Sequence, residues 1–259
     1  MKIRALFLTI LGFLFAASAL ANTAVLTSVN GTVQAQVGTA PARALRVGDE
    51  VQQGATISTG ANSSAVLRFS DGQIAALTAN SQMTITAYQY NAQAGTGNVL
   101  LSLVTGGMRA ITGLIGKRTP DRVSYRAASA TIGIRGTDVT VATAAGNVVV
   151  TVTEGSISFS FAGQTITIPA GQGVNAKTDG TFQRGAAAQI AAQAPPAVIA
   201  ALNQVTTLTA VIQQAAQTPP PTSPPPGPPP PSEPPPPPPP TPSPSGPTGG
   251  TGGGSASAK

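Results

Sequence analysis

Side chains able to carry out acid–base, nucleophilic or metal chemistry are scarce in this chain. Its 259 residues include 8 Asp and Glu, 14 Lys and Arg, and no His or Cys. Catalytic triads built on His, thiolate nucleophiles, disulfides and metal sites built on His or Cys are therefore excluded. Charged residues make up 8% of the chain, against roughly 25% in ordinary soluble domains. This composition favours a protein that is not an enzyme and that uses no cofactor and no metal.

Two of the acids, Asp71 and Asp138, invite comparison with a catalytic carboxylate pair. Asp71 forms an Asp-Gly pair with Gly72, which is a strong signal for a hairpin turn. Asp138 follows Gly136 and Thr137, and we expect its side chain to cap backbone N–H groups there. The chain has no Asp-x-Asp-x-Asp-Gly loop for calcium. We therefore interpret both acids as structural.

The segment Gly133-Ile134-Arg135-Gly136-Thr137 contains closely spaced glycines. It lacks the Gly-Lys-Ser/Thr of a phosphate-binding loop, and a strand-like segment follows it instead of a helix. We interpret it as a tight backbone corner from which a strand continues. Valine at position 136 is accordingly expected to cost more than about 2 kcal/mol of stability, through strain or repacking.

Basic residues are concentrated in one part of the chain, with Asp121 as the only acid among them. Such a segment attracts acidic partners, such as lipid headgroups, a polyanion or an acidic protein surface. The alternative is a solvated loop, because residues 113–120 have the composition of an exposed turn. Nucleic acid is not expected, because Tyr125 is the only aromatic residue nearby to stack on a base. The basic residues are Arg109, Lys117, Arg118, Arg122, Arg126 and Arg135.

The N-terminal residues 1–21 are typical of a signal peptide. Lys2 and Arg4 precede an apolar run over residues 5–15, and Ala19-Leu20-Ala21 provides a small-x-small cleavage pattern. The apolar run is too short to cross a membrane, which takes about 20 residues; the alternative is an N-terminal anchor that is retained. We expect the chain to be exported to the periplasm or the cell surface, with no transmembrane span in its mature form.

Residues 22–176 have the pattern of an all-β domain. Short runs that alternate apolar and polar residues, such as Ala65–Phe69 and Ser156–Phe161, are separated by turns that contain glycine. β-Branched residues in such runs indicate strands and hairpins. The number and shortness of the strands favour a twisted β-solenoid or a β-sandwich, and no helical periodicity is present.

Residues 186–217 form a segment with helical periodicity, in which we expect one amphipathic helix over 197–216. Its polar face carries no charge, so binding to a membrane surface is less favoured. The helix could pack on the β-domain or mediate self-association through its apolar stripe. That stripe recurs at steps of three and four residues: Val198, Leu202, Val205, Leu208 and Ile212.

Residues 218–259 are first rich in proline and then rich in glycine. Such a composition cannot form a packed core, and we expect a disordered tail with polyproline II conformation in its first part. Its role could be that of an inert tail, a spacer across the envelope or a ligand for a partner that reads proline.

Several of these short patterns occur in the order found in the FecR domain, and residues 24–176 resemble that family. The patterns include glycine pairs, an Asp-Gly turn, the corner described above and a closing Ala-Gly-Gln-Gly. The motif residues are Gly48, Gly54, Gly60, Asp71, Gly72, Gly107, Arg135, Gly136, Thr137, Glu154, Gly155, Gly171 and Gln172.

The resemblance implies a periplasmic all-β module. Its best-known members are membrane-spanning regulators that relay the state of an outer-membrane iron–siderophore receptor to a sigma factor. The uncharged helix and proline-rich tail of this chain depart from their pattern. Our leading hypothesis is therefore an exported, non-enzymatic binding or scaffold module that engages an envelope protein or an acidic polymer. The alternatives are a periplasmic signalling component linked to iron-receptor regulation, and a structural protein of surface assembly or adhesion.

Overall fold

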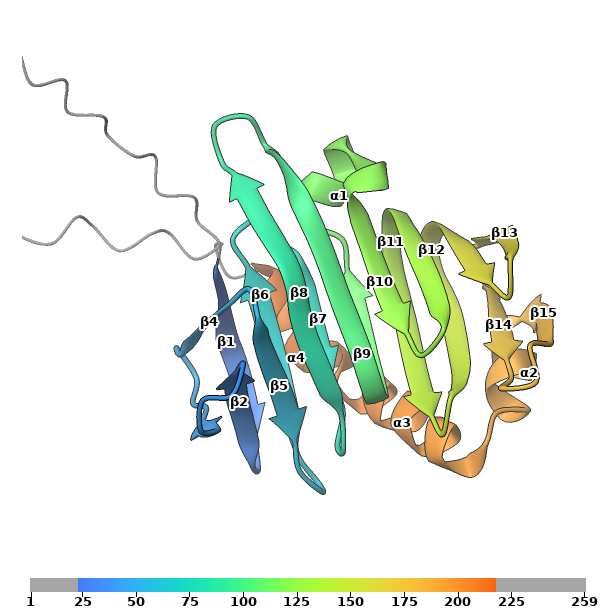
Figure 1. Ribbon diagram of the computed structural model, residues 1–259, viewed down its shortest axis with the longest axis horizontal. Coiled ribbons are helices and arrows are strands. Elements are labelled where there is room, and N and C mark those ends of the chain that lie inside the picture. Colours follow the sequence, from blue (N-terminus) through green and yellow to red (C-terminus); the bar gives the residue numbers. More distant parts are fainter. Residues whose placement is uncertain (1–22, 218–259) are drawn as a thin grey trace, which may run out of the picture. The chain divides into compact units, whose positions relative to one another are not determined.

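A computed structural model describes residues 23–217 of the chain. Strands make up 56% of these residues and helices are few, which confirms the expected mostly β fold (Figure 1). The predicted signal peptide and the proline-rich and glycine-rich tail lie outside the described residues.

The strands of the described chain join into one hydrogen-bonded sheet. Its strands are β1 (Thr23–Asn30), β2 (Val33–Val37), β3 (Arg43–Ala44), β4 (Glu50–Gln52), β5 (Ala55–Thr59), β6 (Ser64–Phe69), β7 (Ile74–Leu77), β8 (Gln82–Asn91), β9 (Thr96–Ile111), β10 (Val123–Ala127), β11 (Ala130–Ala144), β12 (Asn147–Phe161), β13 (Gln164–Pro169), β14 (Gln172–Ala176) and β15 (Phe182–Ala186). The helices are α1 (Leu114–Arg118), a short 3-10 helix η1 (Pro120–Arg122), α2 (Ala187–Ala192), α3 (Pro196–Thr207) and α4 (Thr209–Gln217).

The sheet folds over itself into two layers because the long strands β9, β11 and β12 each pass from one layer to the other. The covered layer, on which the helices pack, runs β4-β1-β6-β7-β9-β11-β12-β14-β15 and takes the second parts of β9 and β11 and the first part of β12. The open layer runs β3-β2-β5-β8-β9-β10-β11-β12-β13 and takes the remaining parts of the three long strands. Neighbouring strands are antiparallel except β9 and β10.

The main core lies between the two layers, because successive side chains of a strand point to opposite faces. In β12, for example, Ile157 and Phe159 are buried while Ser158 between them is partly exposed. Phe69 from the covered layer meets Tyr88 from the open layer with 4.9 Å between ring centroids. The apolar alternation seen in the sequence therefore builds a core shared by both layers.

Strands change layer at corners made by glycines. In β11 and β12, two residues, Gly136 and Thr137, lie opposite the single residue Gly155, which makes a β-bulge. Gly136 has a φ of 60° and Gly155 a φ of 74°, a left-handed conformation that glycine adopts without steric cost. The bulge redirects both strands at the same level, so both cross into the other layer together.

Buried hydroxyl groups complete the corners at the opposite end of the layers. The Thr59 hydroxyl donates to the Thr78 carbonyl oxygen at 2.6 Å and accepts from the Ser81 N–H at 2.9 Å. The Ser81 hydroxyl oxygen in turn accepts from the Gly107 N–H at 3.0 Å. These bonds satisfy backbone groups at points where the strand ladder is interrupted, as buried backbone requires.

The segment expected to form one helix forms two, α3 and α4, which meet at Leu208 with a bend of 48°. Threonines at 206, 207 and 209 surround the break. The Thr207 hydroxyl donates to the Gln204 carbonyl oxygen at 2.7 Å, and such bonds from β-branched residues bend helices. Of the described helices, none alone has the length and apolarity to cross a membrane; α3 and α4 meet that test only when taken together.

Both helices pack their apolar faces on the outer surface of the covered layer, as one of the two interpretations of this segment predicts. Val198 and Ala201 of α3 join a cluster with Ala142 and Val149. On α4, Ile212 belongs to a cluster with residues of β6 and β7. Figure 1 shows α3 and α4 in orange behind the strands. The apolar stripe proposed for self-association is therefore occupied within the chain.

Candidate functional site

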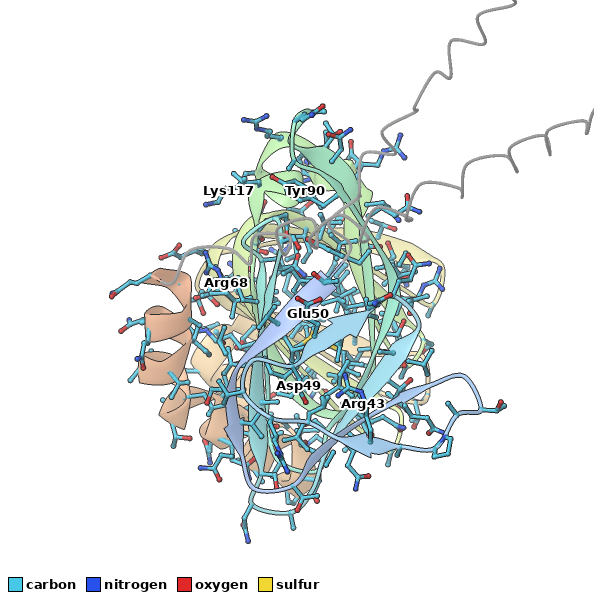
Figure 2. The ribbon with its side chains drawn as sticks, turned by 90° about the vertical axis from the view of Figure 1, so that its left-hand side faces the viewer. Arg43, Asp49, Glu50, Arg68, Tyr90 and Lys117 are labelled. Atoms are coloured by element: carbon cyan, nitrogen blue, oxygen red, sulfur yellow. The ribbon has the colours of Figure 1, made fainter. Side chains whose placement is uncertain are left out.

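Four basic side chains lie on the consecutive elements α1, η1 and β10. Lys117, Arg118, Arg122 and Arg126, here called the basic end, are all exposed. The ion pairs of residues 23–217 are Arg43–Asp49 and Arg109–Asp138, so none of the four belongs to an ion pair there. Figure 2 shows Lys117 at the top of the molecule, away from Arg43 and Asp49. The basic end therefore presents a net positive charge, with exposed Asp121 of η1 as the acid within it.

The basic end is less loop-like than the sequence indicates. Residues 114–118 form α1, and Ile115 and Gly116 are buried; the prediction of an exposed turn over 113–120 is wrong. The Arg118 guanidinium donates to the Ala94 carbonyl oxygen at 3.2 Å and so contacts the β8–β9 hairpin. The buried side chain of Ile115 anchors α1, while Lys117 and Arg118 remain exposed.

Arg109 does not belong to the basic end. Its Nε and Nη2 donate to the two carboxylate oxygens of Asp138 at 2.8 and 2.6 Å, and its Nη1 donates to the Thr209 hydroxyl at 3.0 Å. This two-pronged hydrogen bond raises the pKa of Arg109, with burial acting in the opposite direction. Asp138 thus pairs with an arginine under α4, and the expectation that it caps backbone N–H groups is wrong.

Removing Arg109 should destabilise the protein, because Asp138 would keep a largely buried charge without its partner. We expect Arg109→Met to lower the free energy of unfolding by about 2 kcal/mol, measured by urea denaturation. Arg43→Met is the matched control, because the Arg43–Asp49 pair is exposed and such pairs contribute at most about 1 kcal/mol. Equal effects of the two substitutions would contradict a structural role for the Arg109–Asp138 pair.

Asp71 lies at the centre of a buried polar cluster at the turn between β6 and β7. Its Oδ1 accepts from the Gln73 N–H at 3.1 Å and the Tyr88 hydroxyl at 3.2 Å, and its Oδ2 accepts from the Ile115 N–H at 3.4 Å. Its backbone oxygen accepts from the Leu114 N–H at 2.8 Å. Burial raises the pKa of Asp71, and these hydrogen bonds partly offset that effect. The cluster ties the turn to α1 and thereby supports the basic end.

The cluster does not resemble a catalytic site. Asp138 lies on the outer surface of the covered layer with Arg109, while Asp71 is 1% exposed and faces Tyr88. Within residues 23–217, no group of three or more His, Cys, Asp or Glu is placed to hold a metal ion. The arrangement can fix backbone geometry, and that is the chemistry its hydrogen bonds support.

The other motif residues mostly lie at turns and corners. The Thr137 N–H donates to the Thr112 hydroxyl at 2.8 Å, which joins the end of β9 to the corner within β11. Gly107 lies against α3, where an added Cβ would be 3.0 Å from the Ala201 Cβ. Positive φ angles occur at Gly48, Gly54, Gly72, Gly136, Gly155 and Gly171, but not at Gly60 or Gly107. Arg135 and Glu154 are exposed, and Gln172 at the start of β14 is partly buried.

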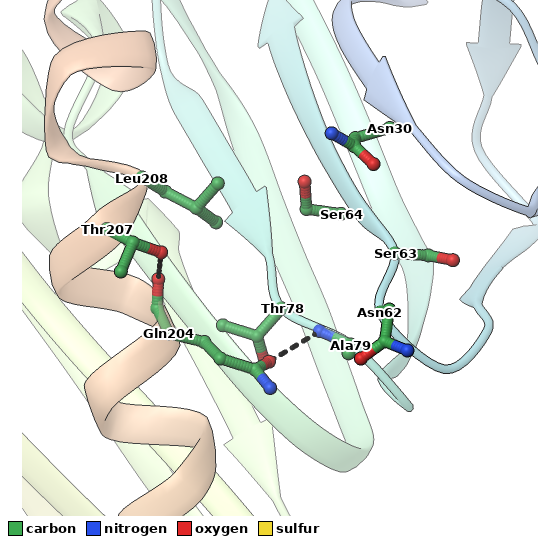
Figure 3. Close-up of a pocket in the computed structure, with 9 residues that line it drawn as sticks. All are labelled: Asn30, Asn62, Ser63, Ser64, Thr78, Ala79, Gln204, Thr207 and Leu208. Atoms are coloured by element: carbon green, nitrogen blue, oxygen red, sulfur yellow. Dashed lines mark hydrogen bonds between the residues drawn. The ribbon is translucent and has the colours of Figure 1, made fainter.

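A pocket that the sequence did not indicate lies between α3 and the corners of the covered layer (Figure 3). Its volume is about 300 Å3, and no charged residue lines it. The Gln204 Oε1 accepts from the Ala79 N–H at 2.9 Å across one side. Its amides and hydroxyls can hydrogen-bond a small neutral molecule. The lining residues are Asn30, Asn62, Ser63, Ser64, Thr78, Ala79, Gln204, Thr207 and Leu208.

Part of this β-sheet domain is similar to a known protein family. Residues 55–158, from β5 into β12, match the family model described as FecR protein, which confirms the resemblance over this part of the chain. No curated protein matches the chain.

Two crystal structures of a candidate anti-sigma factor from Parabacteroides distasonis are similar to this fold. Their sequence identity to this chain is 14%, with TM-scores of 0.41 and 0.40. Each match covers 51% of this chain and 59% of that one. The match therefore spans less than two thirds of the length of that protein.

Proposed function

We propose that this chain is an exported, non-enzymatic binding module of the cell envelope, and that its basic end engages an anionic macromolecule. The observation that carries the proposal is the group of four exposed cations outside the ion pairs of residues 23–217. The FecR domain and the signal-peptide pattern support a place in the envelope. We further propose a β-sandwich over a solenoid, since neighbouring strands are antiparallel except β9 and β10.

Electrostatics favours an extended or multivalent partner over a single small anion. Each exposed charge is screened by salt within about 8 Å, and single exposed ion pairs contribute little. Several cations held together by α1 and β10 attract a partner that places several negative charges on the same surface. Binding through this surface is expected to weaken as the salt concentration rises.

Neutralising the basic end should abolish most of this binding. We expect Lys117→Gln/Arg122→Gln/Arg126→Gln to weaken binding to polyphosphate by more than about tenfold at low salt, measured by fluorescence titration. Arg118 is left in place because it contacts the β8–β9 hairpin.

A matched control removes the same charge from exposed cations elsewhere. The variant Arg46→Gln/Lys177→Gln/Arg184→Gln has the same net charge, and its three positions are exposed and distant in sequence from the basic end. Wild-type affinity in this control, together with the loss above, would locate binding at the basic end. Equal losses in both triple variants would show that only net charge matters and would contradict the proposal.

A second candidate function is signalling linked to an iron receptor, which the FecR domain favours. In this role, the module would respond to the state of an outer-membrane receptor through another protein. A transcript comparison of a deletion strain and its parent under iron limitation tests it. Unchanged expression of receptor genes in the deletion strain would argue against this role and leave the binding role intact.

A further inference from the structure

The outer surface of the open layer is lined with hydroxyl groups. In β12, Ser156, Ser158 and Ser160 point outward between buried apolar residues. In β13, Thr165 and Thr167 are exposed in the same way. The helices α2, α3 and α4 pack on the covered layer, and α3 and α4 lie behind the strands in Figure 1. This surface therefore stays open to solvent in the described chain.

Strand register aligns these side chains in rows that cross the layer. Thr86 and Ser102 hydroxyls are 2.8 Å apart, and so are those of Ser160 and Thr165. With strands about 4.8 Å apart, a row across six strands is about 24 Å long. The row used below, called the hydroxyl row, consists of Thr84, Ser102, Arg126, Thr131, Ser160 and Thr165.

The hydroxyl row is continuous with the basic end. Arg126 belongs to both, and Arg122 directly precedes β10, the strand that carries Arg126. Arg135 is exposed on the same surface of β11, where it pairs with Ser156 of β12. The positions of the hydroxyl row include no acid. Hydroxyls and cations thus form a single surface.

We infer that this surface binds an anionic polysaccharide, an inference that rests on the proposed function of the basic end. The acidic groups of the polymer pair with Arg122, Arg126 and Arg135. Its sugar hydroxyls exchange hydrogen bonds with water for hydrogen bonds with the Ser and Thr side chains. Each such bond contributes little alone, and a polymer makes many of them along one row.

The chemistry of the surface favours a polysaccharide over other anionic macromolecules. Protein interfaces depend on buried aromatic and apolar anchors, and none of the six positions of the hydroxyl row provides one. Single-stranded nucleic acid is held by aromatic stacking, which the row cannot supply either. Proteins bind membrane surfaces by inserting apolar side chains next to basic residues. Exposed Leu114 on α1 could supply one such side chain near the basic end, so vesicles are included in the test.

The test replaces three hydroxyls by methyl groups without changing charge. The row variant is Thr84→Val/Thr131→Val/Thr165→Val, and valine is well suited to strands. The control is Thr153→Val/Thr178→Val/Thr206→Val, which changes three exposed threonines outside the open layer. The full chain is titrated with polygalacturonate, with polyphosphate, with neutral dextran and with phosphatidylglycerol vesicles, and folding is checked by circular dichroism.

We expect the row variant to bind polygalacturonate about tenfold more weakly than the wild type, with polyphosphate binding and the control unchanged. Dextran should bind far more weakly than polygalacturonate. Wild-type affinity of the row variant for polygalacturonate, or binding of vesicles but not of polygalacturonate, would overturn the inference. The basic-end variant decides the proposed function separately, because its loss should extend to polyphosphate.

Discussion

Gly155→Ala is expected to lower the free energy of unfolding by about 3 kcal/mol or more. A Cβ at this position would overlap with the Gly136 carbonyl oxygen and lie 3.0 Å from the Arg135 carbonyl oxygen. Both are backbone atoms of the neighbouring strand, so no side chain can rotate away to make room. The residue would also have to keep a φ of 74°, which costs an alanine about 1 kcal/mol by itself. Urea denaturation of purified variants measures the loss.

Gly163→Ala is the matched control for backbone conformation. Gly163 has a φ of 77° in the β12–β13 turn, and an added Cβ there would meet no atom within 4 Å. It should cost about 1 kcal/mol. If Gly155→Ala cost no more than this control, close packing at the corner would be refuted. An insoluble Gly155→Ala beside a soluble Gly163→Ala would agree with the expectation.

The same comparison changes the reason given for Gly136. The sequence indicates that valine at 136 is costly through strain or repacking, but an added Cβ there meets nothing within 4 Å. The expected loss of stability therefore comes from backbone strain alone, because Gly136 has a φ of 60° that a β-branched residue rarely adopts. The crowded residue at this corner is Gly155, for which the sequence indicates no close packing.

The sequence predicts the strands because burial follows their alternation, as in Ser156–Phe161. It does not predict which strands are neighbours, because alternation fixes the face of a residue but not its partner. The parallel pairing of β9 and β10 depends on α1, whose five residues are too few for a periodic pattern. The sequence does not indicate the break between α3 and α4 either, because the apolar spacing continues through Leu208 as it would in a single helix.

The candidate functional residues also divide into those that the sequence indicates and those that only strand pairing brings together. Arg109 belongs to the basic segment by its position in sequence, but strand pairing places it beside Asp138. The pocket in Figure 3 joins segments near residues 30, 62, 78 and 204, and no local pattern connects them. The hydroxyl groups on the outer surface of the open layer have a local signal in β12 and β13, because Ser156-x-Ser158-x-Ser160 is followed by Thr165-x-Thr167. The polar positions that alternate with the apolar ones in these strands therefore predict an exposed surface of hydroxyl groups.

Asp71→Ala is the second substitution with a large expected effect. It would leave the buried N–H groups of Gln73 and Ile115, and the Tyr88 hydroxyl, without their carboxylate acceptor. Unsatisfied buried polar groups cost about 1–3 kcal/mol each, and part of this is recovered because no charge is then buried. We expect a net loss of about 3 kcal/mol by urea denaturation at neutral pH.

Asp71→Asn is the matched control, because its carbonyl oxygen can still accept from Gln73 and Tyr88 while the charge is removed. It should cost about 1 kcal/mol, mainly through the contact with the Ile115 N–H. If alanine and asparagine cost the same, the hydrogen bonds to Asp71 would not be what stabilises the turn.

The pH dependence of stability separates the charge of Asp71 from its hydrogen bonds. Burial raises the pKa of Asp71 in the folded protein, so the folded protein holds this proton more tightly than the unfolded chain, whose carboxyl has a pKa of about 4. Between that value and the raised pKa, stability falls as pH rises. The wild type should therefore lose stability relative to Asp71→Asn when the pH rises from about 4 through this window, and a difference that is constant or has the opposite sign would refute the burial of a titrating carboxyl at this turn.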